Sequence, residues 1–259
     1  MRRQFRSRQA NRELHNEYLQ QLQELRGRLY LKDGAICEAN LSAGGRFRMP
    51  GDEDAWHLLL VDNTSRVIGC VRYLVHPSTV QFEHLRLAKS CLALDQSWSE
   101  KVRRSVEADL DIVRRNGLCY VEAGGWAISE EWRGTRAALE IAIGSYALGR
   151  MWGGALGSCT ATARHGSASI LRRLGGQSLR VGDETIPPYY DRSYDCSMEL
   201  LRFDYRIPAE RYAPLIEHLT ERFSETPVLI AAETPVPCFA LLTDVLRPRA
   251  RRLPGRASV

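Results

Sequence analysis

The chain has 259 residues and a net charge of +5, and its 44% hydrophobic and 26% charged residues are typical of a soluble globular protein with a full core. Its most apolar stretch, 137–156, is interrupted by Glu140, Arg150 and glycines, which argues against a membrane span and predicts a buried helix. Seven scattered cysteines, without a C-x-x-C motif or a histidine spacing suited to zinc, predict no metal site and a reducing cytoplasm.

The positive charge is concentrated at the two ends of the chain. Residues 1–12 and 247–259 each contain five arginines and no acidic residue; removing these ten from the 36 basic residues leaves 26 against 31 acidic ones. No apolar signal-peptide core follows the first arginines. We expect both ends to be solvated and partly disordered. Peripheral contact with an anionic membrane is left open, and nucleic acid is not expected as a partner.

The first predicted element is a helix over about 9–27, which Gly27 is expected to end, followed by a short strand over 28–31. The clearest hairpin of the chain joins 56–62 to 67–75. The next helix runs from about Ser99 to Asn116. We expect a Ser97–Glu100 capping box at its start and an end at Gly117. Its buried stripe should consist of Val102, Val106, Leu110 and Val113.

The second half of the chain alternates strands and helices. The predicted strands are 118–128, 156–162 and 197–204, and the predicted helices are 135–152, 166–174 and 208–224, the last with Pro208 in its first turn. This order predicts an α+β fold with a central, mixed, mostly antiparallel and splayed sheet packed by helices on both faces. We divide the chain into a basic tail with an N-terminal helix (1–27), a central domain (28–205), and a C-terminal helix with a Pro-rich basic tail (206–259).

One strand and the loop after it carry the strongest functional signal. Glu122 lies in an otherwise apolar strand, and the loop Glu130–Gly134 leads into a long apolar helix at Thr135. A helix N-terminus and its preceding loop can present backbone N–H groups to a phosphate, which points to acyl transfer from a phosphate-bearing thioester. Glu122 is the candidate general base, with a pKa raised by burial. The structural alternative is a core carboxylate paired with an arginine such as Arg72.

Four stretches together resemble the GNAT acyltransferase superfamily. They resemble most closely its branch of acyl-homoserine-lactone synthases, ornithine-lipid acyltransferases and N-acyl amino acid synthases, and within it the last group. The matching stretches are Asp54-Ala-Trp-His-Leu-Leu, Gly69-Cys-Val-Arg-Tyr-Leu, 122–134 and 189–204. The resemblance covers about residues 28–205. It implies a bacterial N-acyltransferase with a GNAT fold, in which a long-chain acyl group passes from acyl carrier protein to the amine of an amino acid or related small amine.

Departures from the GNAT pattern bear on the donor and on the chemistry. Arg136 stands where acetyl-CoA enzymes have the central glycine of the phosphate loop; its guanidinium suits the single phosphate of a carrier protein's phosphopantetheine, although acyl-CoA stays open. Leu171 stands where a tyrosine often protonates the leaving thiolate, and Arg164 replaces an asparagine. Gly125 replaces the branch's arginine, so no role for that arginine carries over.

The resemblance and the residues together give the candidate site. The catalytic candidates are Glu122 as base and Gly124 with Gly125 as a β-bulge that frees an N–H for the thioester oxygen. Candidates for donor binding are Trp126, Ile128, Arg133, Gly134, Thr135, Arg136, Thr160, Thr162 and His165, and candidates for acceptor binding are Asp54, Arg72, Tyr189 and Tyr190. The alternatives are a homoserine-lactone synthase using S-adenosylmethionine, an acetyl-CoA-dependent N-acetyltransferase, and a degenerate GNAT scaffold that binds nucleic acid or membrane through its basic tails.

Overall fold

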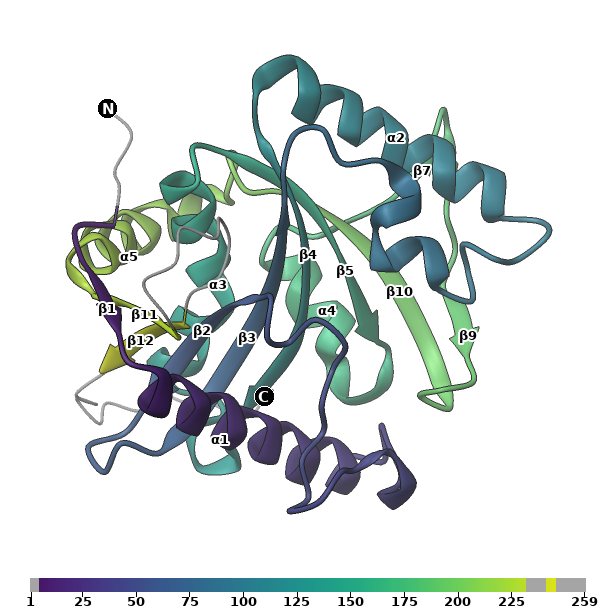
Figure 1. The fold of residues 1–259 in the computed structure, drawn as a ribbon. Coiled ribbons are helices and arrows are strands. Elements are labelled where there is room, and N and C mark those ends of the chain that lie inside the picture. The colour runs from purple at the N-terminus through teal and green to yellow at the C-terminus, as the bar shows by residue number, and fades with distance from the viewer. Residues whose placement is uncertain (1–4, 232–240, 246–259) are drawn as a thin grey trace, which may run out of the picture.

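The computed structural model describes residues 5–231 and 241–245, in which helices cover both faces of one large mixed sheet (Figure 1). The strands of this sheet follow the order β1-β11-β12-β2-β3-β4-β5-β10-β6, with β9 beside β10. Their bounds are β1 Arg8–Ala10, β2 Trp56–Val61, β3 Val67–His76, β4 Cys119–Ile128, β5 Ala155–Thr162, β6 Gln177–Ser178, β9 Tyr189–Asp191, β10 Cys196–Asp204, β11 Val228–Ile230 and β12 Leu241–Val245. A separate pair consists of β7 Arg180–Val181 and β8 Glu184–Thr185.

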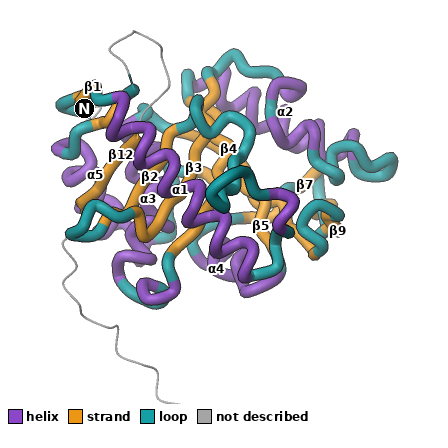
Figure 2. The backbone as a smooth tube through the Cα atoms, turned by 60° about the horizontal axis from the view of Figure 1, so that its bottom comes forward, coloured by secondary structure: helices purple, strands orange, loops and turns teal. Residues whose placement is uncertain are grey.

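Most strand pairs are antiparallel, including β2–β3, β3–β4 and β5–β10, whereas β4 and β5 run parallel. The longer helices are α1 Arg12–Lys32, α2 Ser99–Asn116, α3 Arg136–Met151, α4 Ser167–Arg173 and α5 Ala213–Glu225. α1 and α2 lie on one face of the sheet, and α3, α4 and α5 lie on the other (Figures 1 and 2). The predicted fold class, an α+β protein with a mostly antiparallel sheet between helices, is confirmed.

Alternation along each strand divides the core between the two faces. Leu58 and Leu60 of β2 pack with α3 and α5, whereas Leu59 and Val61 pack under α1. The stripe predicted for α2 is fully buried, with Val102, Val106, Leu110 and Val113 at most 1% exposed. These residues pack on Tyr120, Leu156 and Leu200 of the central strands.

Three predicted boundaries are wrong. α1 continues through Gly27 to Lys32, so the strand expected over 28–31 is helical. Gly27 is a close-approach residue and not a stop, because a Cβ there would lie 2.0 Å from the carbonyl oxygen of Gly45. α2 ends at Gly117 as expected, but its N-cap is Trp98 without a capping side chain, and Asp95 accepts the nearby N–H groups in place of Ser97.

The C-terminal helix also starts later than predicted. A 3₁₀ turn, Glu210–Tyr212, precedes α5, and Pro214 occupies the first turn in place of Pro208. Sequence analysis missed β1, β11 and β12, which extend the sheet beyond β2. Within 5–231 and 241–245 no helix is long and apolar enough to cross a membrane. The arginines of 247–259, like Arg2, Arg3 and Cys238, lie outside the described residues.

Candidate active site

A β-bulge interrupts β4 at the glycine pair. Opposite β3, the register shifts so that Cys70 faces Ala127 while Arg72 faces Gly124. Gly125 has φ +62°, a left-handed conformation that favours glycine. A side chain there would also meet Arg26, whose Nη1 lies 2.9 Å from an added Cβ, so a larger residue at this position would displace the buried guanidinium. The predicted bulge at Gly124–Gly125 is therefore confirmed as geometry.

The parallel strands β4 and β5 separate where this bulge begins. Their last paired residues are Ala123 and Cys159, and no later β4–β5 pair occurs in the described chain. β5 continues to Thr162 paired with β10 alone, with Thr160 exposed and Thr162 half-buried. On β4, Trp126 and Ile128 are half-buried against the core under α3. The buried Nε1 of Trp126 has no hydrogen-bond partner among the described residues. Several of the predicted donor-binding residues therefore lie on the ends of β4 and β5 that do not pair with each other.

The loop before α3 has the form expected for a phosphate site. Gly134 has φ +71°, and Thr135 is the N-cap: its hydroxyl accepts from the Ala138 N–H at 3.3 Å and donates to the Trp132 carbonyl at 2.7 Å. The Thr135 hydroxyl is thus used in capping, and the first N–H groups of α3 remain for a ligand. Arg133 lies 3.5 Å from Asp33, and the Nε of Arg136 donates to Glu140 at 2.7 Å.

Glu122 is held by three hydrogen bonds on the face of the sheet that carries α1 and α2. Its Oε2 lies 2.9 Å from Nε2 of His76 and accepts from the Arg86 N–H at 3.0 Å, while its Oε1 accepts from the Leu87 N–H at 2.8 Å. His76 and Glu122 are diagonal neighbours across β3 and β4, because His76 pairs with Tyr120 and Glu122 with Leu74.

These contacts correct the expected acid–base behaviour of Glu122. Burial raises its pKa, but the hydrogen bonds from His76 and from the two backbone N–H groups outweigh burial, and the pKa is lowered from its ordinary value of 4.5. The partner of Glu122 is His76 and not Arg72, which the structural alternative had suggested. Glu122 is therefore a stably ionised carboxylate and a weak base.

A cavity of about 910 Å³ opens on this face. Its walls come from the loop between α1 and β2, the end of β3, the 3₁₀ turn Arg86–Lys89, and the turn after β9. The polar residues that line it are Asn40, Asp54, His76, Arg86, Lys89, Ser90, Asp191, Ser193 and Tyr194. His76 lines the cavity and contacts Glu122, so it connects this space to the carboxylate on β4.

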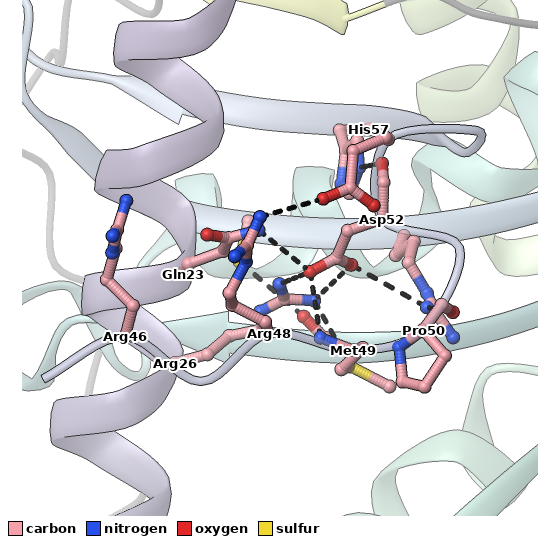
Figure 3. A network of polar contacts seen from close by, with 12 residues as sticks. Gln23, Arg26, Arg46, Arg48, Met49, Pro50, Asp52 and His57 are labelled. Carbon is pink, nitrogen blue, oxygen red and sulfur yellow. Dashed lines mark hydrogen bonds and ion pairs between the residues drawn. The ribbon is translucent and has the colours of Figure 1, made fainter. Parts of the chain in front are cut away.

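A buried charge network lies between the cavity loop and the bulge (Figure 3). Asp52 accepts from Arg26, from Gln23 at 3.2 Å and from the Met49 N–H at 2.9 Å, and its Oδ1 lies 3.6 Å from Nη1 of Arg72. His57 donates Nε2–H to the Asp52 carbonyl at 2.8 Å. Burial lowers the pKa of His57 to about 4, so it is neutral.

The network therefore holds two guanidinium groups for one carboxylate. Burial, opposed by Asp52 and assisted by Arg86 and Arg26, lowers the pKa of Arg72 to about 10, which leaves it charged at neutral pH. Its Nε has no partner among the described residues, while its Nη1 donates to the Pro50 carbonyl at 2.9 Å. Arg86 donates to the same carbonyl, and Pro50 lines the cavity. Two cations thus converge on one wall of the cavity.

The structure distributes the predicted acceptor residues unevenly. Asp54 lines the cavity and Arg72 stands behind its Pro50 wall, whereas Tyr189 and Tyr190 are not among the lining residues; the exposed Tyr190 donates to Asp195 instead. Of His165 only the backbone, in the turn Arg164–Gly166, is described.

Sequence reasoning did not single out Arg26, Asp52, His76 or Arg86. The sequence could have indicated that Arg26 is buried, because it follows Leu22 by one turn on the apolar face of α1. No such pattern indicated His76.

Three arginines on or beside α3 and α4 are engaged within the chain. Arg150 pairs with Glu217 at 2.7 Å, Arg172 with Glu199 at 2.5 Å, and Arg164 donates to the carbonyls of Gly34 and Asp195. Among residues 5–231 and 241–245 no group of three or more histidine, cysteine or acidic side chains could hold a metal ion.

Comparison with known proteins identifies the fold. No protein-family model matches the sequence, and no curated protein matches it. The CoA-dependent acyl-homoserine lactone synthase BjaI, solved with SAM and isopentyl-CoA, aligns over 92% of each chain with a TM-score of 0.52 and 16% identity, and its complex with MTA gives the same values. FeeM, an N-acyl amino acid synthase from uncultured soil microbes, aligns over 73% of this chain and 91% of its own, with a TM-score of 0.43 and 15% identity. The likeness to BjaI confirms the predicted GNAT-type fold.

Proposed function

We propose that the protein is an N-acyltransferase that moves an acyl group from a phosphopantetheine thioester to the amine of a small acceptor in the cavity. One observation carries this proposal. Glu122 pairs with Ser158 just before β4 and β5 separate, and its carboxylate contacts His76 and Arg86, which line the cavity. A thioester between the splayed strands and an amine in the cavity would therefore meet at the same segment of β4.

The donor would enter from the side of α3. Its phosphate would lie at the first turn of α3, beside Arg133 and Arg136, where backbone N–H groups and the helix dipole favour an anion. Its carbonyl oxygen would lie at the bulge, where a backbone N–H can stabilise the tetrahedral oxyanion. We propose acyl carrier protein as donor because Arg136 replaces the central loop glycine. Acyl-CoA is the second candidate donor, because BjaI, which has a similar fold, is a CoA-dependent enzyme.

The acceptor would be an amino acid or a similar molecule that carries both an amine and a carboxylate. Arg72 and Arg86 converge on the Pro50 carbonyl with one buried carboxylate, Asp52, nearby. Their excess positive charge favours a carboxylate at this wall. Asp54 and Asp191 also line the cavity and would attract the amine.

The test is a reconstituted reaction with the purified full-length chain. Octanoyl, lauroyl and palmitoyl thioesters of acyl carrier protein and of CoA are each incubated with a mixture of the twenty amino acids, and mass spectrometry detects N-acyl products while a thiol reagent measures release of the carrier. A parallel arm contains SAM. We expect N-acyl amino acids, formed faster from the carrier protein. An acyl-homoserine lactone in the SAM arm would favour a lactone synthase, and no acyl transfer in any arm would contradict the proposal.

A further inference from the structure

We infer that His76 is the group that takes the proton from the acceptor amine, and that Glu122 is a positioning residue that fixes the tautomer of His76. This inference rests on the proposed function and names the acid–base residues of the same site. The juxtaposition that carries it is the His76–Glu122 contact at 2.9 Å, with His76 and not Glu122 lining the cavity.

The bonding of Glu122 argues against direct proton transfer to its carboxylate. Both oxygens already accept hydrogen bonds. Two of the three bonds come from the backbone N–H groups of Arg86 and Leu87, and the third comes from His76. Backbone donors favour the ionised form, and the pKa of Glu122 is lowered accordingly. A carboxylate with this bonding takes up protons weakly, but it is a strong acceptor for an imidazole N–H.

The bonding of Glu122 also determines which nitrogen of His76 is basic. The carboxylate has no proton to give, so Nε2 of His76 donates to it, and the lone pair of the neutral ring belongs to Nδ1. The His76 side chain is 19% exposed, and the ring forms part of the cavity wall. A histidine oriented by a carboxylate is the arrangement in which an imidazole serves as general base.

His76 and solvent supply all the proton transfers that the reaction needs. Nδ1 of His76 takes a proton from the amine nitrogen as that nitrogen bonds to the thioester carbonyl carbon. The C–S bond then breaks, and the pantetheine sulfur leaves as a thiolate, which takes a proton from solvent. The imidazolium returns its proton to solvent, so acyl thioester and amine yield amide and thiol. Leu171 in place of a tyrosine acid is compatible with this scheme, because the thiolate needs no protein proton donor.

Other charged groups line the same cavity as His76. Arg86 and Lys89 come from the 3₁₀ turn, Asp54 from the loop before β2, and Asp191 from β9, and all line the same cavity. In the described part of the chain the hydrogen-bond partner of the His76 ring is Glu122, and none of these four side chains bonds to it.

Two variants test the inference by turnover. His76→Ala and Glu122→Gln should each lower acyl transfer by about 10²–10⁴-fold. The first substitution removes the base, and the second replaces the charged acceptor of Nε2–H by a neutral amide, which orients the ring less strongly. Added imidazole should restore part of the activity of His76→Ala and none of that of Glu122→Gln. His84→Gln, at an exposed histidine outside the cavity, is the matched control and should keep wild-type turnover. Wild-type turnover in His76→Ala would overturn the inference.

A second readout does not depend on turnover. Two-bond ¹H–¹⁵N correlation spectra of the full chain, at a pH high enough to keep the ring neutral, should give the Nε2–H tautomer for His76 and a larger share of the Nδ1–H tautomer after Glu122→Gln. An Nδ1–H tautomer in the wild type would overturn the inference even where the enzyme is active. A wild-type protein with no acyl transfer in any arm would instead overturn the proposed function, and the proton-transfer role with it.

Discussion

Arg26 of α1 and Asp52 of the loop before β2 form a two-point ion pair whose side chains are both wholly buried, with Nη1–Oδ1 and Nη2–Oδ2 distances of 3.0 and 2.5 Å. The pair attaches the middle of α1 to the loop that forms one wall of the cavity. It also lies against the bulge of β4, because Nη1 of Arg26 is 2.9 Å from the position that a Cβ would take at Gly125. The helix α1, the cavity loop and the strand β4 are therefore joined by one buried contact.

Loss of the Asp52 carboxylate should strongly destabilise the protein. Asp52→Ala would leave Arg26 and Arg72 buried without a counter-ion, and breaking a buried ion pair from one side costs about 3–5 kcal/mol. Urea unfolding followed by circular dichroism measures the change. Glu53→Ala is the matched control, because Glu53 pairs with Arg48 on the surface, where both side chains are 56% exposed, and should cost about 0–1 kcal/mol. Equal effects of the two substitutions would contradict the importance assigned to the buried pair.

The sequence predicted the structural features that depend on hydrophobic periodicity and turn chemistry. The hairpin of β2 and β3, the stripe of α2, the end at Gly117 and the cap at Thr135 follow from local patterns and are present. It failed where tertiary contacts decide. Gly27 has the signature of a helix stop, yet it stays helical because the loop at Gly45 packs on it.

The candidate site also combines features that follow from local patterns with features that depend on tertiary contacts. Glu122 and the two glycines follow from the motif, but the partner of Glu122 depends on the register between β3 and β4, which the motif does not contain. His76 looks like an ordinary strand-end residue before Pro77. Pairing places it diagonally across from Glu122, and the loop after α1 lines the same cavity as His76. The pKa of Glu122 differed from expectation for the same reason, since its backbone donors come from Arg86 and Leu87 far along the chain.

The two glycines of the bulge should differ sharply in their tolerance of a methyl group. Gly125→Ala requires φ near +62° and brings Cβ to 2.9 Å from Nη1 of Arg26. The left-handed conformation alone costs about 1–2 kcal/mol, and displacing Arg26 adds to it. Gly124→Ala would meet only Met49, at 3.9 Å, and should change the free energy of unfolding by less. Urea unfolding of the two variants side by side tests this, and an equal loss would refute the contact with Arg26.

Acid should remove the stabilisation that Glu122 provides. Its folded-state pKa is depressed below the ordinary 4.5, so the ionised carboxylate stabilises the fold at pH values above 4.5. This stabilisation is lost as the pH falls from 4.5 through the folded-state pKa. Glu122→Gln should therefore be less stable than wild type at pH 7, and the difference should shrink toward pH 3. Urea titrations at a series of pH values measure it, and a difference that grows on acidification would contradict the sign of the shift.

Arg136 should discriminate between the two candidate donors. It is the first residue of α3, its side chain is 64% exposed, and its Nε pairs with the buried Glu140. Glu140 also pairs with Arg222 at 3.2 Å, so it would keep a cationic partner when the Arg136 guanidinium turns to a phosphate. If the guanidinium holds the single phosphate of a carrier-bound pantetheine, Arg136→Ala should raise the KM for acyl carrier protein more than that for acyl-CoA. The CoA pyrophosphate would retain the N–H groups of the helix N-terminus. Arg150→Ala, which removes an arginine paired with Glu217 at the other end of α3, controls for a general loss of basic surface. Steady-state kinetics with both donors supplies the four KM ratios, and an equal rise for both donors in Arg136→Ala would remove the argument for a carrier-protein donor.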